Sequence, residues 1–97
     1  MLTLTLVAAG NVSSASGAAR SCANVPGADV IQATNTTCRE AHKVIRLWLA
    51  GYERDGKVNR RVSKWSCRVS VNSVEGEVAT CRKGRGQRIG WYVNIPR

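Results

Sequence analysis

Apolar residues recur at helical spacing over residues 37–52. They fall on one stripe of a 3.6-residue helix, and charged residues fill the opposite side. The stripe consists of Cys38, Ala41, Val44, Ile45, Trp48, Leu49 and Tyr52. Thr37 and Glu40 have the spacing of a capping box, in which each side chain accepts a hydrogen bond from a backbone N–H at the helix start. The pattern predicts an amphipathic helix that begins at Thr37 and ends near Gly51 or Gly56.

Strict alternation of apolar and polar residues follows the predicted helix. The alternating segments are residues 64–72 and 88–95, and residues 77–83 lie between them, joined to each by a short turn at 72–76 or 83–87. Alternation of this kind predicts strands with one buried face, and the short turns predict a meander. A β-branched run at residues 29–34 predicts a further strand, and the polar segment 53–61 is expected to be a loop.

Three of the four cysteines share the apolar side of these elements. Cys38 lies on the helix stripe, Cys67 shares a strand face with Trp65, and Cys81 shares one with Ala79. Trp48, Trp65 and Trp91 are likewise expected in the core. We therefore expect an α+β fold, in which one amphipathic helix packs on a small antiparallel sheet of three to four strands and disulfides stabilise the domain.

A chain of 97 residues is long enough for one small domain, which we place at residues 20–97. The even number of cysteines, Cys22, Cys38, Cys67 and Cys81, is typical of a disulfide framework in a short exported chain. Their wide spacing is unlike the close cysteine pairs of structural zinc sites, so no metal is expected. Sequence does not choose among the three possible pairings.

The N-terminus has the character of a secretory signal. An apolar run from Leu2 to Ala9 leads into small residues, which predicts a signal peptide over residues 1–19. The basic residue that usually precedes such a run is missing here. We expect a protein that is secreted or associated with the cell envelope.

The spacing of the cysteines, tryptophans and neighbouring core residues is similar to that of a known group of domains. Cys38, Ala41, Val44 and Trp48 in the helix are followed by Trp65 and Cys67, by Cys81 and Gly84, and by Ile89 and Trp91. This pattern resembles a group of small exported domains of high-GC Gram-positive bacteria over roughly residues 22–93. The resemblance implies export, disulfides and an α+β fold, and it transfers no catalytic residue.

Positive charge is concentrated in the second half of the chain. Lysine and arginine number 15 against six acidic residues, a net charge of +9. Such an excess attracts polyanions or anionic membrane surfaces. The candidate basic patch consists of Arg60, Arg61, Lys64, Arg68, Arg82, Lys83, Arg85 and Arg88. Tyr92 is a candidate stacking surface beside it, and a purely solvating basic face is the alternative.

Residues that could carry catalysis do not form a recognisable set. His42 is the single histidine and is expected to be solvent-exposed on the polar side of the helix. If the cysteines are paired, no thiol nucleophile remains. The glycines at 84, 86 and 90 lack the helix that follows a phosphate-binding loop. The sequence therefore predicts a protein that is not an enzyme and needs no cofactor.

Three functional hypotheses remain. The first is an exported, monomeric binding module that engages an anionic cell-envelope polymer, an anionic lipid surface or an acidic protein without turnover. The second is a disulfide-stabilised inhibitor or effector of another protein, with a turn such as residues 72–76 or 83–87 as the contact loop. The third is a cationic antimicrobial protein. A specific nucleic-acid target is not expected for an exported chain.

Overall fold

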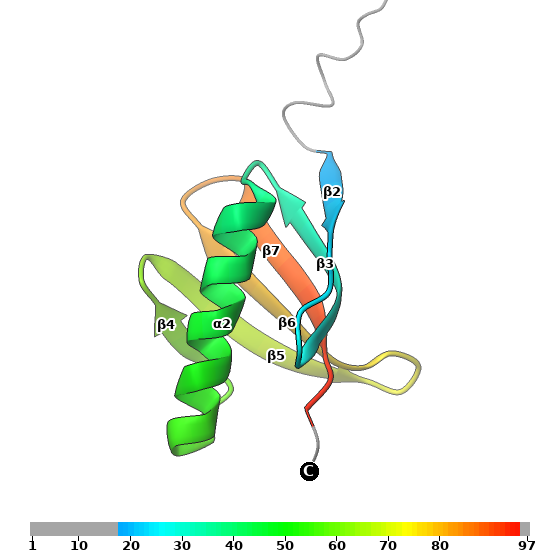
Figure 1. Cartoon of the computed structure of the whole chain (residues 1–97), viewed down its shortest axis with the longest axis vertical. Coiled ribbons are helices and arrows are strands. Elements are labelled where there is room, and N and C mark those ends of the chain that lie inside the picture. Colours follow the sequence, from blue (N-terminus) through cyan, green and yellow to red (C-terminus); the bar gives the residue numbers. More distant parts are fainter. Residues whose placement is uncertain (1–17, 96–97) are drawn as a thin grey trace, which may run out of the picture.

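The computed structural model describes residues 18–95, in which one helix lies across one face of a six-stranded antiparallel sheet (Figure 1). The elements are β2 (Ala19–Cys22), β3 (Ala28–Thr34), α2 (Cys38–Asp55), β4 (Arg60–Val62), β5 (Trp65–Asn72), β6 (Gly76–Lys83) and β7 (Gln87–Val93). Apart from Ala18 and Ala19, the predicted signal peptide lies outside the described residues.

The strand order is β2-β3-β7-β6-β5-β4, and every neighbouring pair is antiparallel. Strands β4 to β7 form a meander, and β3 pairs with the last strand of that meander. The connection from β3 to β4 must therefore pass over β7, β6 and β5 to reach the far edge of the sheet. Helix α2 makes this crossing, which is why it lies diagonally over one face (Figure 1).

The predicted start of the helix is confirmed. Thr37 Oγ1 accepts a hydrogen bond from the backbone N–H of Glu40 at 3.0 Å. The Glu40 carboxylate accepts a hydrogen bond from Trp65 Nε1 at 3.1 Å, and this contact ties the first turn to β5. The helix ends at Asp55, where Gly56 in the left-handed conformation donates its N–H to the Tyr52 carbonyl at 2.7 Å.

The predicted number of three to four strands is wrong. The sheet gains a fourth meander strand, β4, which begins inside the segment 53–61 that was expected to be a loop. It also gains β2, which extends to Ala19 at the end of the predicted signal peptide. Both are short edge strands: β2 has four residues and pairs with β3, and β4 has three and pairs with β5. Their extended conformation depends on this pairing, so they leave no periodic pattern in the sequence.

The core lies between α2 and the sheet, as the periodicities predicted. Trp48 and Trp65 are fully buried, and Trp91 is 1% exposed. The Trp48 ring packs edge-on against Trp91 with centroids 5.6 Å apart and stacks on Tyr52 at 5.5 Å. Trp48 Nε1 donates to the Val58 carbonyl at 3.0 Å, so this large ring is buried without losing its hydrogen bond.

Both disulfides join elements that meet in the core. Cys22 on β2 is bonded to Cys38, the first residue of α2, and Cys67 on β5 is bonded to Cys81 directly opposite on β6. Residues 18–95 contain no free cysteine. The expectation of a disulfide-stabilised α+β domain is confirmed, and the structure supplies the pairing that the sequence left open.

Candidate functional site

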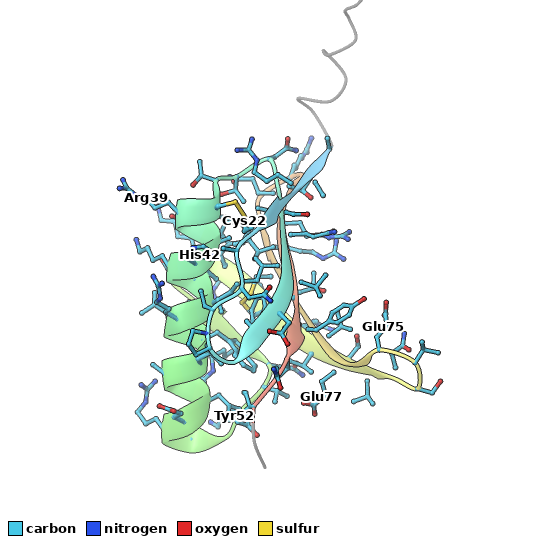
Figure 2. The ribbon with its side chains drawn as sticks, turned by 45° about the vertical axis from the view of Figure 1, so that its right-hand side comes forward. Cys22, Arg39, His42, Tyr52, Glu75 and Glu77 are labelled. Atoms are coloured by element: carbon cyan, nitrogen blue, oxygen red, sulfur yellow. A yellow bond between two sulfur atoms is a disulfide. The ribbon has the colours of Figure 1, made fainter. Side chains whose placement is uncertain are left out.

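The sheet has two different faces. Helix α2 packs on one of them, and no other element between residues 18 and 95 covers the opposite one, which we call the outer face (Figure 2). Side chains alternate between the two faces along each strand. On β7 the buried residues Ile89 and Trp91 point to the helix, so Arg88, Gly90 and Tyr92 belong to the outer face.

Four arginines gather at one end of the outer face. Arg82 on β6 lies directly opposite Arg88 on β7, and Ser66 on β5 separates Arg82 from Arg61 on β4 in the same cross-strand row. Arg68 lies on β5 in the next row, opposite Thr80. All four arginines are exposed, and within residues 18–95 their side chains have no hydrogen bond or ion pair.

The Arg82 and Arg88 pair is electrostatically unfavourable by itself. Like charges directly opposite each other in an antiparallel pair destabilise a sheet. Every described acidic residue lies off this end of the outer face, and the one ion pair among residues 18–95 joins Asp55 to Arg60 on the helix side. A bound anion would relieve this repulsion.

The other four predicted patch residues lie elsewhere. Arg60 points to the helix side, opposite the buried Cys67, and its guanidinium donates to the Gly51 carbonyl at 3.1 Å. Lys83 also points to the helix side, with its Nζ 5.1 Å from the centroid of the Trp65 ring. Lys64 and Arg85 lie in exposed turns at the ends of β5 and β6.

Arg60 has a structural environment. Besides Gly51, it contacts the Asp55 carboxylate and the Lys57 carbonyl, the latter at 3.2 Å. The backbone N–H of Lys57 and the Arg60 guanidinium hold the pKa of the Asp55 carboxyl below its ordinary value. Arg60 thus fixes the end of α2 and is not available to a ligand on the outer face.

The outer face is uneven, with three open hollows that border the arginines. One of about 440 Å³ lies beside Arg82 and Arg88, and one of about 370 Å³ lies between Arg68 and Arg82. The third, of about 160 Å³, lies over Gly90. Hydroxyl and amide groups line them together with the arginines, so a ligand on this surface would meet hydrogen-bond donors along its length.

Acidic residues occupy the opposite end of the outer face and are engaged there. Asp29 accepts a hydrogen bond from Asn94 Nδ2 at 2.9 Å. Glu75 accepts one from the Tyr92 hydroxyl at 2.7 Å, and this bond raises the pKa of the Tyr92 phenol. The outer face therefore runs from a basic end to an end with hydrogen-bonded carboxylates.

The structure also places His42 and Gly90. His42 was expected to be solvent-exposed but is half-buried, and its Nε2 lies 2.8 Å from the Ala23 carbonyl in the segment between β2 and β3. Gly90 lies inside β7, within the segment 88–95 where a strand was predicted. The sequence places Gly90 between Arg88 and Tyr92 on one strand face. It does not reveal that β3 lies beside Gly90, because that depends on the strand order of the sheet.

No group of three metal-binding side chains occurs between residues 18 and 95, and no helix there is long and apolar enough to cross a membrane. Comparisons with models of protein families, with curated proteins and with solved structures gave no match to this chain.

Proposed function

We propose that the protein is an exported binding module whose outer face holds an anionic polymer of the cell envelope without turnover. The observation that carries this proposal is the exposed cross-strand pair of Arg82 and Arg88, which has no counter-charge among the described residues. Arg61 and Arg68 extend the basic surface on neighbouring strands. Guanidinium groups bind phosphates, sulfates and carboxylates through paired hydrogen bonds.

A polymer suits the outer face better than a lipid surface does. Proteins that lie on membranes combine basic residues with apolar side chains that enter the headgroup region. The residues directly opposite these arginines on β5 and β6 are polar, Ser66 and Thr80, and the exposed Val30 lies on β3. The most exposed large apolar residues, Val71 and Val74, lie at the far hairpin between β5 and β6. A chain-like anion can follow the hollows across several strands.

The test compares two variants with the same net charge. Arg82→Gln/Arg88→Gln removes the pair on the outer face, and Lys43→Gln/Arg46→Gln removes two exposed charges from α2. We expect the first variant to bind polyphosphate at least about tenfold more weakly than the wild type, a loss of about 1.4 kcal/mol. We expect the second to stay within about twofold. Calorimetric titration of the full chain measures both.

Equal losses in the two variants would contradict the proposal, because they would show attraction to net charge without a preferred face. Unchanged binding by the Arg82→Gln/Arg88→Gln variant would also contradict it. Melting temperatures measured in parallel show whether each variant is folded.

One observation favours a second candidate, an inhibitor or effector of another protein. Val74 is 89% exposed in the turn between β5 and β6, which projects from the end of the sheet (Figure 1). Asn72 Oδ1 accepts hydrogen bonds from the backbone N–H groups of Val74 and Glu75, at 2.8 and 3.0 Å. A rigid turn with an exposed apolar tip is a suitable contact loop, since little entropy is lost on binding.

A further inference from the structure

The hollow over Gly90 arises from a missing side chain in the middle of a strand. Glycine weakens a strand, and a glycine inside one often marks the close approach of another group. Neither backbone conformation nor crowding requires glycine here. The φ angle of Gly90 lies outside the left-handed region, and a Cβ atom built on it meets nothing nearer than the Ala79 carbonyl oxygen at 3.7 Å.

Four different side chains surround this position. Thr80 on β6 and Gln32 on β3 lie directly opposite Gly90 on its two sides. Arg88 and Tyr92 lie two residues before and after it on β7, on the same face. A hydroxyl, an amide, a guanidinium and an aromatic ring thus border one open space of about 160 Å³.

Backbone strain occurs at the rim of the same hollow. Val30 has a φ of 51°, which is rare for a β-branched residue, at a bulge between Asp29 and Gln32. The Asn24 side chain holds this conformation, since its Oδ1 accepts a hydrogen bond from the Val30 N–H at 3.0 Å. Strained backbone is concentrated at ligand-binding sites, where the geometry of the site depends on it.

We infer that the Gly90 hollow binds one sugar ring of an acidic polysaccharide. This inference depends on the proposed function and names the class of its polymer. Pockets for drug-sized ligands have volumes of roughly 300–1,000 Å³. A hollow of about 160 Å³ suits a single ring. The C–H face of the ring lies against Tyr92, and Thr80 and Gln32 bond its hydroxyls.

The charges along the outer face determine which way the acidic substituent of the sugar points. Arg88 lies on the basic side of the hollow and takes the acidic substituent of the sugar. Glu75 lies on the other side, where it holds the Tyr92 hydroxyl and repels a second anion. The Arg82 guanidinium, opposite Arg88, is placed for the next charge along the polymer. A polyanion without sugar rings would contact the arginines but not the Gly90 hollow.

Two polymers and three variants of the full chain test this inference. Polygalacturonate carries a carboxylate on each sugar ring, and polyphosphate carries charge without rings. Gly90→Val fills the hollow, and Thr80→Val removes one hydroxyl while keeping the shape of the side chain. Ser21→Val is the matched control, because it places the same side chain on the outer face of β2, two strands from Gly90.

We expect Gly90→Val and Thr80→Val each to weaken polygalacturonate binding at least about fivefold and to leave polyphosphate binding within about twofold. Ser21→Val should change neither affinity. The inference is overturned if folded Gly90→Val and Thr80→Val bind polygalacturonate as tightly as the wild type, or if they lose both polymers equally. Failure of the proposed function has a different signature, since Arg82→Gln/Arg88→Gln would then bind both polymers as the wild type does.

Discussion

Neighbouring arginines in this protein have different roles because of the direction of their side chains. Arg60 points toward the helix and donates to the carbonyls of Gly51 and Lys57, at 3.1 and 3.2 Å. Arg61, the next residue, points to the outer face opposite Ser66. One side chain therefore contributes to stability, and the other is available to a ligand.

Gly51 provides a test of the structural role of Arg60. Replacing a helical glycine with alanine usually stabilises a protein by about 1 kcal/mol. At this site the new Cβ would overlap the Arg60 guanidinium, which would have to give up its bonds to two carbonyls. Hydrogen bonds from a charged donor are worth about 1.5–3 kcal/mol each. After subtraction of the helix gain, we expect Gly51→Ala to lower the free energy of unfolding by roughly 2–5 kcal/mol, measured by urea denaturation.

The control for this prediction is the same substitution in a chain that carries Arg60→Ala. Without the guanidinium, Gly51→Ala should stabilise the helix by the usual amount, about 1 kcal/mol. A stabilising effect in the wild-type background would show that Arg60 moves aside without loss.

At the level of elements, the two disulfides hold different parts of the fold. Cys22–Cys38 attaches the edge strand β2, whose one strand neighbour is β3, to the start of α2. Cys67–Cys81 joins two strands of the meander and is buried under the helix. The first therefore secures a peripheral element, and the second secures the centre.

Removing each disulfide should separate these two effects. In the chain-entropy model, closing a loop of about 15 residues stabilises a protein by about 3 kcal/mol. We expect Cys67→Ala/Cys81→Ala to lower the stability of the whole domain by about this amount. Cys22→Ala/Cys38→Ala should chiefly increase amide hydrogen exchange in β2 and its partner β3. Hydrogen exchange combined with thermal denaturation measures both effects, and equal exchange profiles in the two variants would contradict the distinction.

Elements with strong periodicity could be predicted from the sequence. The apolar stripe of α2 and the alternation in β5 and β7 follow from burial of one face. These patterns correctly predicted that the tryptophan of each element is buried. The end of α2 could not be chosen, because Gly51 and Gly56 are both stop signals and the contact of Gly51 with Arg60 exists only in three dimensions. Strands as short as β4 depend on their neighbour for their conformation.

The candidate site was predictable to the same extent. Alternation along β5 correctly placed Arg68 opposite the apolar side, and the same rule puts Lys83 on the side of Cys81, facing Trp65. The direction of the Arg60 side chain could not be predicted, because the strand that carries it, β4, was not expected. The alignment of Arg82 with Arg88 required the register of β6 and β7, which a turn sequence does not specify.

For the whole molecule, the crossing of α2 from β3 to β4 separates the core from the basic surface. The helix buries one face of the sheet, and the four arginines Arg61, Arg68, Arg82 and Arg88 lie on the other. Helix α2 has its own exposed basic residues, among them Lys43 and Arg46. Total charge alone therefore does not identify the binding surface, and its position on the sheet has to be tested.

Salt dependence gives that test. Binding to a linear polyanion releases counterions, so the logarithm of the affinity falls linearly with the logarithm of the salt concentration. Each lost phosphate contact reduces the slope by about one. We expect Arg82→Gln/Arg88→Gln to reduce the slope for polyphosphate by about two, and Lys43→Gln/Arg46→Gln to leave it unchanged. Equal slopes in the wild type and the Arg82→Gln/Arg88→Gln variant would place the contacts elsewhere.

The short edge strands have a consequence for self-association. An open sheet edge offers unpaired N–H and C=O groups to the strands of other molecules and can seed fibres. Here the edges are β2, with four residues, and β4, with three. Beyond the end of β4, Asn59 Oδ1 accepts the hydrogen bond of the Val69 N–H at 3.0 Å, so a side chain occupies a position that a foreign strand would need. Short edges and this side-chain bond thereby hinder the addition of a second copy of the protein to the open sheet.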